Sequence, residues 1–158
     1  MSAPPHTEAG LAGPTWLLRA VLGTGLVVAG ADKFFDKLAV WSMYLSPAAE
    51  RLLPVSGPAF LHLVGPLEVA IGLALLTRWP RLGAYAMAAW LACIAVNLAL
   101  AGSFWDLMVR DLEIATSAFV LGRLVAWQEA SHPARSPRAD HGEGATWAHG
   151  APETRKSP

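Results

Sequence analysis

The residues of this chain that could do chemistry are charged side chains inside otherwise apolar sequence. Glu68 lies about halfway along the apolar segment Pro58–Thr77, and Gly65 and Gly72 share its helical face at i−3 and i+4. If this segment spans a bilayer, a lone carboxylate there costs roughly 2.5–3.5 kcal/mol on insertion scales, so it must be protonated, paired or in a wet cavity. We therefore expect Glu68 to point into a helical bundle, along a face narrow enough for close helix packing.

A second group of charges opens the last apolar segment. Asp106, Arg110 and Glu113 are spaced i, i+4 and i+7, which places them on one stripe of a helix, whereas Asp111 points away from that stripe. Arg110 is the natural counter-ion for Asp106, for Glu113 or, across a bundle, for Glu68. Two interpretations stay open, a structural lattice of ion pairs and a site for a polar headgroup such as a quinone carbonyl or a small anion.

If quinone chemistry occurs here, the same side chains have defined roles. Glu68 or Glu113 would carry the proton, because a carboxylate can act as a general acid or base. Arg110 would fix the carbonyl or set the pKa of a carboxylate beside it. Arg19, about one turn into the first apolar segment, either snorkels to the headgroups or is an internal partner for a carboxylate or an anionic headgroup.

Other side-chain chemistry is sparse. The single cysteine, Cys93, cannot form an internal disulfide, a CxxC pair or a thiolate cluster. His132, His141 and His149 lack the i, i+4 spacing of helical metal ligands, so we predict no metal site. The formal net charge is zero, which gives no indication of a nucleic-acid partner.

Four apolar segments must position these side chains. Each is about 18–21 residues long, enough to cross a hydrocarbon core of ~30 Å at 1.5 Å per residue. They are Pro14–Ala31, Pro58–Thr77, Leu82–Ala101 and Leu107–Trp127. The chain is 54% hydrophobic and 15% charged, whereas soluble domains carry about 25% charge. Because backbone polar groups in a bilayer must pair internally, we predict an all-α integral membrane four-helix bundle.

The composition divides the 158 residues into three parts. We predict a disordered head at 1–13, a four-span membrane domain at 14–127 and a disordered cytoplasmic tail at 128–158. The longest connection, 32–57, is partly amphipathic, which indicates a short interfacial helix between spans one and two. A capping loop over the bundle is the alternative.

The charge distribution predicts an orientation. Four spans place both termini on one side, together with Arg78, Arg81 and Arg123. The positive-inside rule then puts both termini in the cytoplasm and the longest connection outside the inner membrane.

Three segments together resemble the DoxX/DoxD-like family of small four-span membrane proteins. The first span, LLRAVLGTGLVVAGADKFF, is similar to the family's opening, with an early arginine and a G-x-x-K-F ending. The second, GPLEVAIGLALLTRWPRLGA, is similar to its E-x-x-x-G-x-x-L-L-x-x-R segment, and VRDLEIATSAFVLG is similar to its late R-D helix start. The resemblance covers roughly residues 15–127.

This resemblance implies a four-helix membrane bundle and a link to redox complexes. Some relatives are subunits of thiosulfate:quinone oxidoreductases, and others associate with redox or detoxification enzymes. The positions carried over as candidate functional residues are Arg19, Lys33, Glu68, Arg110 and Asp111. Together with the charges described above, this gives the candidate catalytic residues Glu68, Arg110, Asp111 and Glu113. The candidate residues for binding a quinone are Arg19, Lys33 and Arg110.

The leading hypothesis is a subunit or accessory protein of a quinone-linked membrane redox complex. Without a CxxC pair, a haem-type histidine pair in facing spans or a nucleotide loop, the chain is not a complete oxidoreductase on its own. Its expected partners are the bilayer, a membrane or peripheral protein, and a second copy of itself. The alternatives are a non-enzymatic scaffold, in which Glu68 and Arg110 are a structural pair, and a small-solute carrier, less favoured without an internal repeat.

Overall fold

The computed structural model describes residues 6–131, which form four long helices and two short helical segments, with no strand among these residues. The elements are α1 (His6–Asp32), η1 (Trp41–Tyr44), α2 (Pro47–Leu52), α3 (Gly57–Leu76), α4 (Pro80–Ala101) and α5 (Trp105–Ser131). The all-α prediction is therefore confirmed for the described part of the chain.

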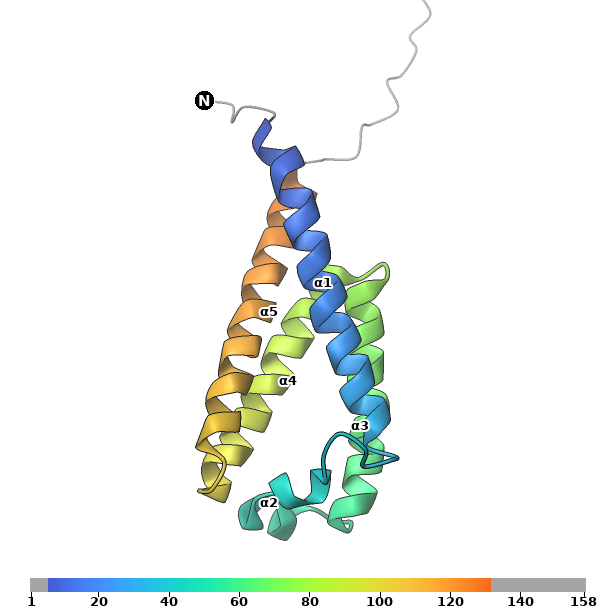
Figure 1. The fold of residues 1–158 in the computed structure, drawn as a ribbon, viewed down its shortest axis with the longest axis vertical. Helices are drawn as coiled ribbons and strands as arrows, with labels where there is room; N and C mark the ends of the chain where they lie inside the picture. The colour runs from blue at the N-terminus through green and yellow to red at the C-terminus, as the bar shows by residue number, and fades with distance from the viewer. Residues whose placement is uncertain (1–5, 132–158) are drawn as a thin grey trace, which may run out of the picture.

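The long helices alternate in direction, so the bundle has two distinct ends (Figure 1). The start of α1 and the end of α5 lie at one end, called here the terminal end. The connection between α1 and α3, residues 33–56, lies at the other, called the loop end. α1 packs mainly against α3 and α4 mainly against α5, while α1 touches α5 much less.

Three of the described helical segments are long and apolar enough to cross a membrane: Leu11–Asp32, Gly57–Leu76 and Pro80–Ala101. α5 is long enough as well, but four charged residues lie within its stretch Asp106–Glu113. Large apolar side chains on all four long helices are exposed on the outside of the bundle, among them Trp16, Val28, Leu63, Leu100 and Phe119. This exposed apolar surface indicates a lipid bilayer as the surroundings.

Glycines bring α1 and α3 into close contact. A Cβ atom built at Gly30 would lie 2.6 Å from the carbonyl oxygen of Gly65, and one at Gly72 would lie 2.7 Å from that of Gly23. Because no larger residue fits at these distances, the helices can approach this closely only with glycine at the crossing. The same face of α3 carries Glu68, so the crossing fixes where Glu68 meets α1.

The ends of α1 and α5 differ from the predicted boundaries. α1 begins at His6, so residues 6–13, predicted as part of a disordered head, are helical in the structure. Glu8, Leu11 and two alanines favour a helix there, and the helix continues through Pro14 although proline removes a backbone hydrogen bond and crowds the preceding turn. α5 continues to Ser131, four residues into the predicted tail. The remaining head and tail residues, 1–5 and 132–158, lie outside the described part.

The connection contains two short helical segments, η1 and α2, instead of one interfacial helix. Asn97 on α4 holds it: the Asn97 side chain accepts a hydrogen bond from Ser46 N at 3.0 Å and donates one to Tyr44 O at 2.7 Å. The Tyr44 ring meets the ring of Phe104 edge-on, with centroids 5.0 Å apart. The connection therefore folds across the loop end of the bundle, as the capping-loop alternative describes.

Candidate functional site

The centre of the site is a buried ion pair between α3 and the residue that follows α1. Lys33 Nζ lies 2.6 Å from Glu68 Oε2. Lys33 is 6% exposed and Glu68 only 2%, so both charges are removed from solvent. The position of the pair follows from the glycine crossing, because Gly30 and Gly65 each precede one partner by three residues.

Two tryptophans complete the surroundings of this pair. Trp90 on α4 donates its indole N–H to Glu68 Oε1 at 2.9 Å, so each carboxylate oxygen has a donor. The ring of Trp41 covers the Lys33 ammonium, with Nζ 3.8 Å from the ring centroid. A desolvated ammonium over an indole face is among the stronger cation–π arrangements. The side chains of Lys33, Glu68, Trp41 and Trp90 are called the buried cluster below.

Asp32 determines where Trp41 sits. Its carboxylate accepts hydrogen bonds from Lys37 N at 3.0 Å, from Leu38 N at 2.9 Å and from the Trp41 indole at 2.9 Å. The carboxylate thus turns the chain back on itself directly after α1. A carboxylate that receives several N–H donors is a strong local organiser, since charge-assisted hydrogen bonds are about twice as strong as neutral ones.

The charged side chains of α5 make no direct contact with this pair, although the Asp111 carboxylate is close enough to interact electrostatically with both of its charges. Asp111 is 7% exposed and faces the interior of the bundle, whereas Asp106, Arg110 and Glu113 are exposed. Arg110 contacts its neighbour Asp111 at 3.4 Å. The predicted pairing of Arg110 with Glu68 is therefore wrong: α1 and not α5 packs against α3, so Lys33 is the cation that reaches Glu68.

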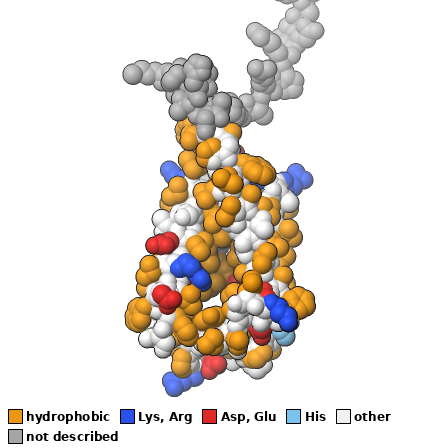
Figure 2. All heavy atoms as spheres, in the orientation of Figure 1, with side chains coloured by type: hydrophobic (Ala, Val, Ile, Leu, Met, Phe, Trp, Pro, Cys, Tyr) orange, Lys and Arg blue, Asp and Glu red, His pale blue; other side chains and the backbone are white. Residues whose placement is uncertain are grey.

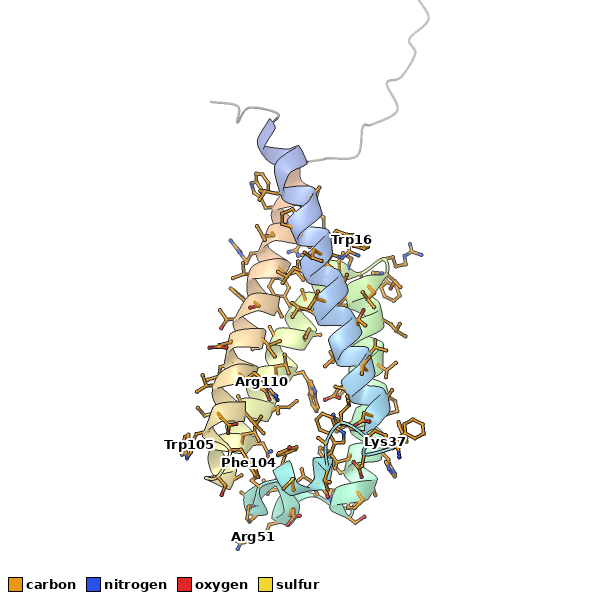
Figure 3. The ribbon with its side chains drawn as sticks, viewed as in Figure 1. Trp16, Lys37, Arg51, Phe104, Trp105 and Arg110 are labelled. Atoms are coloured by element: carbon orange, nitrogen blue, oxygen red, sulfur yellow. The ribbon has the colours of Figure 1, made fainter. Side chains whose placement is uncertain are left out.

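The surface between α1 and α5 is hollowed toward the loop end, with charged side chains along the rim formed by α5 (Figure 2). Arg110 lies on the side of α5 that faces α1 in this view (Figure 3). α1 and α5 come together at the terminal end, where Gln128 donates to Thr15 Oγ1 at 3.2 Å.

Arg19 contacts neither the Lys33–Glu68 pair nor the charged side chains of α5. Its guanidinium donates to the last carbonyls of α3, at 3.2 Å to Leu75 O, 3.4 Å to Leu76 O and 3.0 Å to Thr77 O. A cation at a helix C-terminus satisfies carbonyls that have no partner in the helix and interacts favourably with its dipole. Arg19 therefore binds the end of a helix, an arrangement that neither of the two interpretations from the sequence, snorkelling to the headgroups or an internal anionic partner, had included.

Glu68 and, through the family resemblance, Lys33 were predicted from the sequence, and the structure brings them together. Asp32, Trp41 and Trp90 were not predicted as parts of the same site. One signal for Trp90 was present: it lies near the middle of an apolar segment, away from the interfaces where tryptophan is usual. Among residues 6–131, no group of three His, Cys, Asp or Glu side chains could hold a metal ion.

Comparison with known proteins adds nothing to this picture: no family model, no curated protein and no solved structure matches the chain. The resemblance to the DoxX/DoxD-like family stays a prediction that rests on the sequence motifs.

The buried cluster has a definite chemical capacity. The Lys33 ammonium and the Trp90 N–H are hydrogen-bond donors at the same carboxylate, in surroundings of low polarity where such bonds are strong. A carbonyl or hydroxyl oxygen that displaced one carboxylate contact would find these donors already in place. Glu68 and Lys33 can also exchange a proton with such a group, since carboxyl and amino groups serve as general acids and bases.

Proposed function

We propose that the chain is a four-span membrane protein that serves as an accessory subunit of a quinone-linked redox complex. In this proposal the buried cluster binds the polar headgroup of the quinone. The observation that carries it is the Lys33–Glu68 pair, which is buried within the bundle. Ionisable residues at membrane depth are rare and costly, and they mark functional sites by default.

Support for α5 as the fourth span comes from its tryptophans. Trp105 and Trp127, 57% and 41% exposed, are 22 residues apart. At 1.5 Å per residue the two indoles are about 33 Å apart along the helix, close to the thickness of the hydrocarbon core. Tryptophan is enriched at both membrane interfaces. Between them, Asp111 faces the interior, as a charged residue in a span should.

In this proposal, each residue of the buried cluster has a role that follows from its chemistry, and the partner protein supplies the electrons. Lys33 and Trp90 donate hydrogen bonds to the headgroup, and Glu68 gives or takes a proton. Full reduction of a quinone needs two electrons and two protons, and we assign the electrons to the partner protein, because the chain offers no dithiol and only one cysteine. With the termini in the cytoplasm of a cell with an inner membrane, the buried cluster lies in the outer half of the bilayer.

The test is purification of the tagged full-length protein from its native membrane in mild detergent, followed by analysis of retained quinone and copurifying proteins. We expect quinone at near-stoichiometric amounts in the native protein and a loss of about tenfold, equal to 1.4 kcal/mol, in the double variant Lys33→Met/Glu68→Gln. Glu129→Gln is the matched control, because it removes an exposed carboxylate from the same bundle. Equal quinone content in all three proteins would contradict the proposal.

A scaffold is the second candidate function, and the charged stripe of α5 favours it. Asp106, Arg110 and Glu113 are exposed on a helix whose other exposed residues are largely apolar, so a partner with complementary charge could cover them. The same purification separates the two functions. If the protein is a scaffold, the double variant Asp106→Asn/Glu113→Gln should lose the copurifying partner. The double variant Lys33→Met/Glu68→Gln should keep it.

A further inference from the structure

A side chain of the connection, Trp41, packs on the Lys33–Glu68 pair at the Lys33 ammonium. Trp41 lies with its ring on the Lys33 ammonium, and its indole N–H is bound to Asp32. Lys37, four residues after Lys33, is exposed at the same end of the molecule (Figure 3). The two lysines are therefore near each other in sequence but differ completely in their access to water.

The segment that carries Trp41 is held at both ends by side chains of the long helices. On its N-terminal side Asp32, the last residue of α1, binds the backbone N–H groups of Lys37 and Leu38. On its C-terminal side Asn97 of α4 binds Tyr44 and Ser46, and Ser46 is fully buried. Buried polar contacts of this kind specify one position for a loop that has few apolar contacts of its own.

We infer that the connection is a lid over the buried cluster, with Trp41 as the seal between the Lys33–Glu68 pair and the water at the loop end. Asp32 and Asn97 are the positioning residues that hold the lid shut. The inference goes beyond the proposed function and does not depend on it, because it concerns which groups reach Lys33 and not which ligand binds there.

The test is chemical modification of the two lysines in the full-length protein, reconstituted in lipid nanodiscs. A water-soluble amine reagent is applied near pH 10, where lysine begins to lose its proton, and each site is read by mass spectrometry of peptides. In the native protein we expect Lys33 to react at least about tenfold more slowly than Lys37, because buried groups react only through local opening. In Trp41→Ala we expect Lys33 to approach the rate of Lys37.

Matched variants separate the seal from other effects. Trp41→Phe keeps an aromatic ring over Lys33 and should keep the protection. Asp32→Asn weakens the anchor of Trp41 and should expose Lys33. Asp36→Asn is the control, because Asp36 is exposed and accepts one hydrogen bond, from Trp41 N at 3.4 Å, which an asparagine oxygen can also accept, so Lys33 should stay protected.

Protection by the seal must also be distinguished from protection by charge. Glu68→Gln removes the counter-ion of Lys33 but leaves Trp41 in place. If Lys33 stays slow in this variant, the seal protects it. If Lys33 instead reacts as fast as Lys37 in this variant, the ion pair alone was protective and the lid is ruled out. The lid is also ruled out if Lys33 stays slow in Trp41→Ala.

Backbone amide exchange in α3 and α4 verifies that each variant is folded. Asn97→Ala, which frees the other end of the connection, replaces any variant that is not folded.

Discussion

At the scale of single residues, the buried ion pair is where one substitution has the largest effect. Lys33→Met leaves the Glu68 carboxylate with the Trp90 indole but no cation, inside an apolar bundle. Breaking a buried pair by removal of one partner typically destabilises by about 3–5 kcal/mol, because the remaining charge is uncompensated. We expect a loss of this size, measured by reversible unfolding of the purified protein in mixed micelles.

The double variant Lys33→Met/Glu68→Gln tests the cause of that loss. It removes both charges, and the glutamine oxygen can still accept from Trp90, so most of the stability should return. A double variant as unstable as Lys33→Met would show that packing of the lysine stem, and not the unpaired charge, accounts for the effect.

Arg19 gives a smaller effect of a different kind. Arg19→Gln removes a charge from the end of α3 and most of the hydrogen bonds to its last carbonyls. The expected destabilisation is about 1–3 kcal/mol, the usual effect of leaving such groups unsatisfied. Arg81→Gln is the comparison, because Arg81 is exposed and lies 3.6 Å from Glu129, and it should change the free energy of unfolding by less than about 1 kcal/mol. Equal losses in the two variants would contradict a capping role for Arg19.

Glu68 shows how far single residues could be predicted. Its spacing from Gly65 and Gly72 correctly placed it on a packed face, and all three residues are buried. Its partner could not be predicted from composition, because Arg110 and Lys33 are equally suitable cations until one knows which helix packs on α3. The sequence spacing correctly predicted that Asp106, Arg110 and Glu113 lie on one face of a helix. The spacing cannot tell whether that face points into the bundle or away from it.

At the scale of elements, the crossing of α1 and α3 is the most constrained contact. Gly30→Ala places a Cβ against the backbone of α3, where neither helix can yield without moving the other. We expect a destabilisation of about 1–3 kcal/mol, as for other overpacked sites. Gly25→Ala, in the same helix, meets nothing within 4 Å and should be neutral or stabilising by up to about 1 kcal/mol through helix propensity. The pair of variants is compared by thermal unfolding under identical conditions.

The apolar segments of the sequence gave the positions of the long helices, but the connection was harder to predict. Its aromatic and apolar residues read as an amphipathic helix, whereas the structure places Trp41 and Tyr44 in the short segment η1 and forms a separate short helix, α2, after it. The fold of this stretch depends on Asp32 and Asn97, which bind it from helices on either side in sequence. The Asp32 hydrogen bonds are local but not periodic, and those of Asn97 join residues far apart in sequence, so neither leaves a periodic pattern to detect.

At the scale of the whole molecule, the alternating helices make the orientation testable. Lys37 and Arg51 lie at the loop end, and the turn with Arg78 and Arg81 joins α3 to α4 at the other (Figure 3). If the termini lie in the cytoplasm, Lys37 lies on the outer side of the inner membrane. An amine reagent that does not cross membranes should then modify Lys37 in cells whose outer envelope has been removed and whose inner membrane is intact. If Lys37 is modified only after the inner membrane is permeabilised, the orientation is the opposite one, with the loop end in the cytoplasm.

The position of Asn97 also bears on how the protein is assembled during synthesis. The connection leaves the ribosome directly after α1, yet both Asn97, which anchors it, and Trp90, which completes the shell around Glu68, belong to α4. Lys33 and Glu68 can meet, and Asp32 can bind Trp41, as soon as α1 and α3 pair. The second anchor of the connection and the second donor to Glu68 are missing until α4 has been made. The shell around the charged pair is therefore completed only when α4 joins the bundle.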